Sequence, residues 1–246
     1  MSNNKQDHNP GTAPLRNVLA AAKVMEQLIN RAPNMPGLGV LCGPSGYGKT
    51  AAACYCANEY RAHYVECRSY FTKKSLLIAI LEEMGIVPGK TIYDMVKQIG
   101  EQLDLSGRPL IIDEMDHIVD RNLVEMVRDI YEVSQAPILM IGEERFPQKL
   151  KRWERFHNRV LVWQRAEPAD MGDARKLAKV YSHDVEIADD LLKLIVQKTY
   201  GCTRRITVNI NNAREYAREG GFKKLDLEGW GDRPLYLGEA PARRLA

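Results

Sequence analysis

The stretch Gly43-Pro44-Ser45-Gly46-Tyr47-Gly48-Lys49-Thr50 decides the fold of this chain. It has the spacing G-x-x-x-x-G-K-[ST] of a phosphate-binding loop. The apolar run 38–42 before it predicts a buried strand, and the alanine-rich segment 51–60 after it predicts a helix. In this order, strand, glycine loop and helix surround an anion with backbone N–H groups and a helix N-terminus. The stretch therefore predicts a nucleotide site.

The residue types in this loop have separate expected roles. The glycines allow a tight backbone turn, Lys49 supplies a positive charge for the outer phosphates, and Thr50 supplies a hydroxyl for Mg²⁺. ATP and Mg²⁺ are therefore the expected cofactors. The predicted nucleotide-binding residues are Gly43, Pro44, Ser45, Gly46, Tyr47, Gly48, Lys49, Thr50 and Ala51.

The composition narrows the class of protein. Of the 246 residues, 45% are apolar and 27% are charged, which is ordinary for a soluble globular chain. No apolar run approaches the roughly 20 residues of a membrane span, and the polar N-terminus has no signal-peptide core. Five cysteines without a Cys-x-x-Cys spacing indicate reduced thiols in the cytoplasm. A net charge of +3 means that DNA binding would depend on local basic patches.

Five apolar runs predict buried strands, and amphipathic segments between them predict helices. The strands are expected at 38–42, 63–67, 109–114, 137–142 and 159–163. This alternation predicts an α/β fold with a parallel five-stranded sheet between helices. The expected domains are a disordered tail at 1–14, a P-loop ATPase core at 15–166, a strandless helical lid at 167–221 and a loosely attached tail at 222–246.

Two adjacent carboxylates end the third predicted strand. Asp113 at the strand tip would hold Mg²⁺ through water, together with Thr50, and Glu114 would polarise an attacking water as a general base. This pattern is weak alone, but with a P-loop upstream it favours ATP hydrolysis. We expect the nearby Asp116 and His117 to lie on the surface.

Basic residues precede the last predicted strand. Arg152, Arg155 and Arg159 have the spacing i, i+3, i+7 and are expected on one face of a helix. That face is either a solvated surface or the source of an arginine finger, which stabilises negative charge at a neighbouring subunit's nucleotide.

Two further basic pairs have two interpretations each. Arg204 and Arg205 open the last lid helix, with Thr203 as the expected N-cap, and cations there call for a carboxylate or a bound phosphate. Lys73 and Lys74 are expected in a loop that also contains aromatic residues. Such a loop is either solvated or suited to a nucleic-acid backbone.

Together, these motifs resemble the AAA+ ATPases. The resemblance rests on the P-loop, on Asp113-Glu114, on a sensor-like strand end at Gly142-Glu143, on the arginines before the last strand and on Gly-x-x-Arg-Arg at 201–205. Within that superfamily, the chain is most similar to the ATPase subunits of DNA transposition systems, the MuB and TnsC type. The resemblance implies a homo-oligomer, a ring or helical filament, that binds duplex DNA with ATP and without sequence preference. It also implies a transposase as the partner that receives the DNA.

The resemblance also implies residue roles. Lys49 and Thr50 would bind phosphate and Mg²⁺, Asp113 would hold Mg²⁺, and Glu114 would activate water. Arg204 or Arg205 would be the second sensor, and Arg152, Arg155 or Arg159 would be the finger. The first-sensor position is Glu143, where the superfamily usually has a neutral polar residue. The chain also begins almost directly with the ATPase, so DNA contacts are expected from the core, the lid or the tail.

Three alternatives stay open at this point. The first is a helicase-loader or initiator-like ATPase of the same superfamily. The second is a P-loop kinase for a small molecule, although Glu114 after the strand-end aspartate suits water as the acceptor. The third is a nucleotide switch that does not hydrolyse ATP.

Overall fold

The computed structural model describes residues 13–239. The chain divides into two compact units, one of residues 17–167 and one that combines residues up to 16 with residues from 168 onward. The tail expected at 1–14 falls, apart from its last two residues, outside the described part. Within residues 13–239, no helix is long and apolar enough to cross a membrane.

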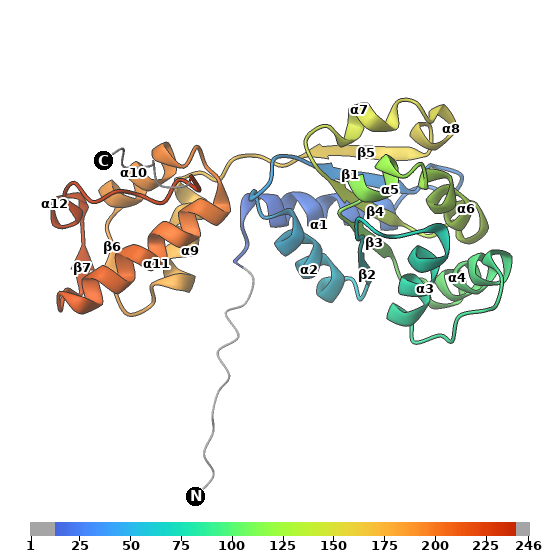
Figure 1. The fold of residues 1–246 in the computed structure, drawn as a ribbon, viewed down its shortest axis with the longest axis horizontal. Coiled ribbons are helices and arrows are strands. Elements are labelled where there is room, and N and C mark those ends of the chain that lie inside the picture. Colours follow the sequence, from blue (N-terminus) through green and yellow to red (C-terminus); the bar gives the residue numbers. More distant parts are fainter. Residues whose placement is uncertain (1–12, 240–246) are drawn as a thin grey trace, which may run out of the picture. The chain divides into compact units, whose positions relative to one another are not determined.

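A five-stranded parallel sheet forms the centre of the larger unit (Figure 1). Its strands are β1 (Leu38–Cys42), β2 (His63–Glu66), β3 (Leu110–Asp113), β4 (Ile138–Gly142) and β5 (Val160–Arg165), in the order β2-β3-β4-β1-β5. The predicted fold class and all five predicted strands are confirmed. Because the strands are parallel, the residues that follow their carboxyl ends meet at one edge of the sheet, where ligands of such folds bind.

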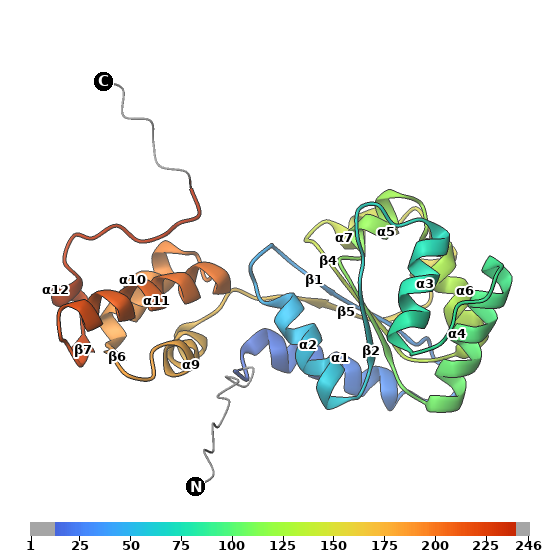
Figure 2. The same ribbon diagram turned by 60° about the horizontal axis from the view of Figure 1, so that its bottom comes forward.

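Helices cover both faces of this sheet (Figure 2). The helices α1 (Arg16–Ile29) and α2 (Lys49–Glu59) lie on one face, and α3 (Lys73–Glu83), α4 (Ile92–Ser106) and α6 (Val124–Ser134) lie on the other. The contact of α1 with β1 is close, because a Cβ at Gly39 would come within 2.7 Å of Leu28 and 2.9 Å of Val24. Two-sided cover explains why β1, β3 and β4 are buried along their whole length and appear in the sequence as continuous apolar runs.

The basic segment before β5 differs from the prediction of one continuous helix. It forms two short helices, α7 (Phe146–Leu150) and α8 (Glu154–His157), and Trp153 between them has the non-helical angles φ −108° and ψ 77°. Arg152 therefore lies between helices, Arg155 lies in α8, and Arg159 lies just before β5. The prediction that these arginines share a helix face is wrong, since that spacing rule requires an uninterrupted helix.

The smaller unit contains the expected helices α9 (Met171–Tyr181), α10 (Asp189–Lys198) and α11 (Thr203–Glu219). It also contains a short parallel sheet of β6 (Glu186–Ile187) and β7 (Lys224–Leu225), followed by α12 (Leu227–Trp230). The expectation of a strandless lid is therefore wrong. Strands of two residues are too short to show the alternation by which sequence patterns reveal strands.

The segment that follows α11 packs on that helix instead of forming the expected loose tail. The side chain of Asn209 is fully buried, donates to the Tyr236 carbonyl at 2.9 Å and accepts from the Tyr236 N–H at 2.7 Å. Trp230 is buried, and the Arg233 guanidinium lies 3.8 Å from the centre of the Tyr216 ring. A buried amide requires hydrogen-bond partners, and these two bonds hold the segment at Tyr236. Residues 240–246 lie outside the described part.

Candidate nucleotide site

The P-loop joins β1 to α2 through two left-handed glycines. Gly46 has φ 81° and Gly48 has φ 80°, values that glycine adopts at little cost. Gly48 is the N-cap of α2, and no side chain caps that helix end. A Cβ at Gly43 would lie 2.8 Å from the Cβ of Ala166, so the loop also needs glycine at its start. The uncapped first turn of α2 suits an anion.

Lys49 is folded back over its own loop. Its Nζ donates to the Gly43 carbonyl at 2.7 Å and to the Pro44 carbonyl at 2.9 Å. Burial lowers the pKa of Lys49, and the carboxylates of Glu114 and Asp113 oppose that shift. An ammonium has three donors, so one proton of this group is left for a phosphate oxygen.

Asp113 ends β3, and Glu114 follows it beside the P-loop. Asp113 is 1% exposed, its Oδ2 accepts a hydrogen bond from the Tyr64 hydroxyl at 3.1 Å, and its Oδ1 accepts from the Glu114 N–H at 2.8 Å. Glu114 has φ 54°, a conformation that non-glycine residues adopt mostly at functional or turn sites. Burial and the Asp113 charge raise the pKa of Glu114, whereas Lys49 lowers it. A raised pKa favours Glu114 as a proton acceptor.

Asp116 is buried, so the expectation that it lies on the surface is wrong. Its Oδ2 accepts from the Glu143 N–H at 2.5 Å, and its Oδ1 lies 3.1 Å from Lys149 Nζ, which also pairs with Asp120 at 2.8 Å. The carboxylate thus links the loops that follow β3 and β4, while the side chain of Glu143 remains exposed. His117 is half-buried.

Asn17 connects the P-loop to the segment that follows β5. Its Nδ2 donates to the carbonyls of Tyr47 and Glu167, both at 2.8 Å, and its Oδ1 accepts from the Glu167 N–H at 2.8 Å. Sequence reasoning missed the four polar residues that support the site, namely Asn17, Tyr64, Asp116 and Lys149. Only Asp116 has a local signal, since it follows Asp113 by three residues, one helical turn, at the start of α5 (Asp116–Asp120).

The residues at the site have the chemistry that Mg²⁺ and a nucleotide require. Thr50 is exposed in the first turn of α2, and Asp113 keeps a second lone pair on each oxygen. Hydroxyl and carboxylate oxygens are ligands that Mg²⁺ accepts, directly or through water. The uncapped helix end and Lys49 supply the positive potential for phosphates. These residues therefore fit a nucleotide with its metal ion.

The three candidate finger arginines differ in their contacts. Arg152 donates from Nη2 to the Val119 carbonyl and to Asn122 Oδ1, both at 3.0 Å, and its guanidinium lies 3.8 Å from the centre of the Trp153 ring. Arg159 pairs with Glu132 at 2.8 Å. Arg155 is exposed, and no ion pair or hydrogen bond joins its side chain to another residue of the described chain.

The other predicted basic residues lie at helix starts. Arg204 is exposed and Arg205 is half-buried in the first turn of α11, whose N-cap is Cys202 and not the expected Thr203. Their role as second sensor stays a prediction. Lys73 and Lys74 lie in the first turn of α3 and not in a loop.

The start of α3 is stabilised by a capping box. Thr72 caps the helix, and its hydroxyl accepts from the Ser75 N–H while the Ser75 hydroxyl accepts from the Thr72 N–H. Of the neighbouring aromatic residues, Tyr70 is exposed and Phe71 is buried. A single aromatic face is thus available beside Lys73 and Lys74.

Comparisons with known proteins agree with this geometry. A family model described as an AAA domain matches residues 34–150. The replication factor C large subunit of Staphylothermus marinus is 27% identical over 116 residues, which cover 46% of this chain and 24% of that protein. This chain therefore spans about a quarter of that curated relative.

Three solved structures show the same fold. The ORC2 protein of Aeropyrum pernix, solved in ADPNP–ADP complexes, is 16% identical with a TM-score of 0.64, over 83% of this chain and 64% of that one. The ORC1 protein of the same organism, solved with DNA, is 18% identical with a TM-score of 0.60, and the match covers 87% of this chain and 62% of that one. The Thermotoga maritima RuvB Holliday junction branch migration motor is 18% identical with a TM-score of 0.58, and the match covers 86% of this chain and 65% of that one.

Proposed function

We propose that this chain is an AAA+ ATPase that hydrolyses ATP and that uses ATP and Mg²⁺ to assemble with its own copies on duplex DNA. The observation that carries the proposal is the convergence of Lys49, Asp113 and Glu114 at the carboxyl edge of the sheet, beside an uncapped helix end. This set contains a phosphate ligand, a metal ligand and a base for water. It contains no feature that selects a small-molecule acceptor.

Each site residue has a role in hydrolysis. Backbone N–H groups of 46–51 and the Lys49 ammonium would offset the phosphate charge, and Thr50 and Asp113 would hold Mg²⁺. Bound Mg·ATP supplies the phosphoryl group that is transferred. Glu114 would accept a proton from the attacking water, for which its raised pKa is favourable. Arg204 or Arg205 would act as the second sensor.

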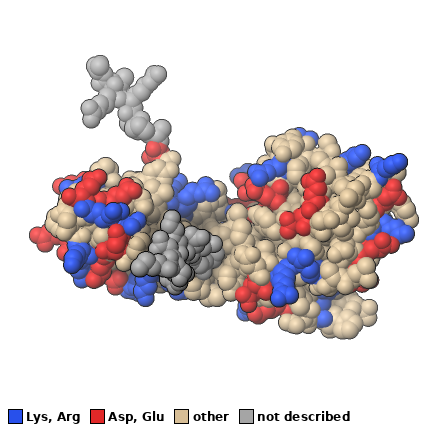
Figure 3. Space-filling model, turned by 90° about the horizontal axis from the view of Figure 1, so that it is seen from below, with Lys and Arg blue, Asp and Glu red and all other residues tan. Residues whose placement is uncertain are grey.

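Assembly would compensate for the weak basic character of one subunit. The net charge is only +3, and on the face drawn in Figure 3 basic and acidic side chains are interspersed. One copy therefore offers few phosphate contacts, whereas an array on the same duplex adds them together. The likeness in fold to the ORC1 protein solved with DNA and to the RuvB motor supports DNA as the partner.

The similar proteins favour an initiator-like or helicase-loader-like role. Replication factor C and ORC2 are among them. Delivery of target DNA to a transposase is the second candidate, favoured by the likeness of the P-loop core and short lid to the MuB and TnsC type. Copurification of the full chain with a replicative helicase or with a transposase separates the two.

ATP turnover with and without duplex DNA is the experiment that tests the shared proposal. We expect phosphate release that rises when duplex DNA of any sequence is added. Transfer of phosphate to a small molecule would instead establish a kinase. Nucleotide binding without turnover under both conditions would establish a switch.

Substitution of the three arginines singly identifies the finger. We expect Arg155→Ala to lower turnover by roughly 10³-fold and to reduce assembly, because its guanidinium is available to a neighbouring copy. Arg152→Ala is the control for a residue engaged within its own subunit and should mainly lower stability. Turnover measured against protein concentration checks this. If turnover falls in Arg159→Ala but not in Arg155→Ala, Arg159 is the finger, and its ion pair with Glu132 opens on assembly.

Replacing Lys73 and Lys74 together with alanine is expected to weaken DNA binding about equally on all sequences. Each lost phosphate contact lowers the slope of log affinity against log salt by about 0.9, so the pair should lower it by about 1.8. A double variant of the exposed Lys90 and Lys97 is the charge-matched control and should leave the slope unchanged. If the salt slope is the same in the unmodified protein and in both double variants, Lys73 and Lys74 do not contact DNA.

A further inference from the structure

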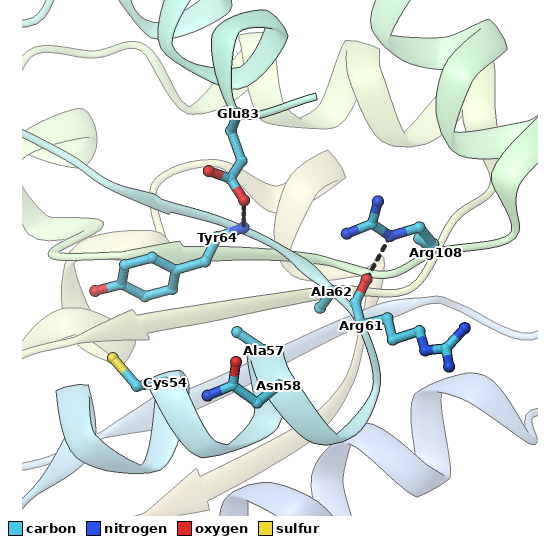
Figure 4. A pocket seen from close by; sticks show the side chains of 8 residues that line it. All are labelled: Cys54, Ala57, Asn58, Arg61, Ala62, Tyr64, Glu83 and Arg108. Atoms are coloured by element: carbon cyan, nitrogen blue, oxygen red, sulfur yellow. Dashed lines mark hydrogen bonds between the residues drawn. The ribbon is translucent and has the colours of Figure 1, made fainter. Parts of the chain in front are cut away.

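Tyr64 reaches the metal-binding aspartate from a neighbouring strand. It lies on β2, the edge strand, opposite Ile111 of β3, and its hydroxyl donates to Asp113 Oδ2 at 3.1 Å. Figure 4 shows its ring beside Cys54 of α2, with the hydroxyl pointing away from Arg61 and Arg108. These residues line an open pocket of 690 Å³ between α2 and β2.

The backbone at Tyr64 is itself fixed. Its N–H, which faces the open edge of the sheet, donates to Glu83 Oε1 at 3.3 Å (Figure 4). Tyr64 is therefore a hydrogen-bond donor on an anchored strand.

Two donors fix both oxygens of the Asp113 carboxylate. The Tyr64 hydroxyl holds Oδ2, and the Glu114 N–H holds Oδ1 at 2.8 Å. The Glu114 N–H is held in place by the left-handed backbone conformation of Glu114. The two hydrogen bonds therefore come from different parts of the chain, one from β2 and one from the residue after β3. A carboxylate held in this way has one orientation and still has a lone pair on each oxygen for a metal ion or its water.

Without the Tyr64 hydrogen bond, Asp113 Oδ2 would be free to respond to the charge of Lys49. The Lys49 ammonium interacts with the Asp113 charge and now donates to two loop carbonyls. A carboxylate that could rotate would be drawn toward this ammonium and would then be less available to Mg²⁺, whereas Lys49 keeps its two bonds to the loop carbonyls. We propose that Tyr64 is a positioning residue that holds Asp113 toward Mg²⁺ and away from Lys49. This inference rests on the nucleotide site of the proposed function.

The test compares nucleotide affinity with and without the metal ion. The dissociation constant of the ATP analogue AMP-PNP is measured by calorimetry in EDTA and in Mg²⁺, and the ratio gives the gain in affinity due to Mg²⁺. We expect Tyr64→Phe to lower this gain about tenfold, the effect of one hydrogen bond to a charged group. Affinity in EDTA should be unchanged. Raising Mg²⁺ should restore kcat in Tyr64→Phe, because the defect lies in metal affinity.

Tyr60→Phe is the matched control. The Tyr60 hydroxyl also contacts a carboxylate, Glu26 at 3.4 Å, but at the far end of α2. Mg²⁺ should raise the AMP-PNP affinity of this variant as much as it does in the unmodified protein. The proposal is overturned if Tyr64→Phe keeps the gain as well, or if it loses affinity equally in EDTA and Mg²⁺. Failure of the nucleotide site itself would appear separately, as absence of AMP-PNP binding to the unmodified protein.

Discussion

Lys49→Ala is expected to abolish ATP turnover and to weaken nucleotide binding by roughly two orders of magnitude. Lys49 is the one side chain of the P-loop that carries charge, and its two bonds to the Gly43 and Pro44 carbonyls place its ammonium over the loop. Charge-assisted hydrogen bonds contribute about 1.5–3 kcal/mol each, so loss of one or two accounts for this effect. Titration with a fluorescent ATP analogue measures the affinity, and phosphate release measures turnover.

The fold should survive this substitution. Lys49 faces the ligand side of the loop and does not belong to the apolar core. Lys23→Ala, which removes an exposed lysine of α1 outside the P-loop, is the charge-matched control and should keep affinity and turnover. Affinity and turnover at the level of the unmodified protein in Lys49→Ala would refute the P-loop assignment.

Glu114→Gln is expected to bind ATP but not to hydrolyse it, with turnover lowered by about 10²–10⁴-fold. Glutamine keeps the shape of the side chain and leaves Asp113 for Mg²⁺, but an amide is a poor base. ATP bound between copies would then persist, and the variant should remain as a stable oligomer on DNA. Light scattering and negative-stain microscopy with duplex DNA and ATP measure this state.

The control for this experiment is Glu144→Gln, a nearby exposed glutamate outside β3 that should hydrolyse ATP normally. A monomeric Glu114→Gln protein that leaves DNA unbound in ATP would contradict the assembly mechanism. The small-molecule kinase would then become the better interpretation.

The sequence alone determined the sheet and the catalytic motifs, because their signals are local. Strands buried on both faces of a parallel sheet appear as continuous apolar runs, as in β1, β3 and β4. The P-loop is eight consecutive residues, and Asp113-Glu114 follows directly from a strand end. Phosphate binding depends on this local backbone, so spacing was sufficient to predict it.

Only the tertiary structure decided which side chains support these motifs. The bond from Tyr64 to Asp113 joins residues 49 positions apart, and that from Asn17 to Glu167 joins residues 150 positions apart. Strand order and packing create such pairs, and no local pattern encodes them. The same applies to the break at Trp153, which separates the three arginines, and to the burial of Asn209 under the C-terminal segment. Each depends on which surface a distant segment covers, and that is settled only when the whole chain packs.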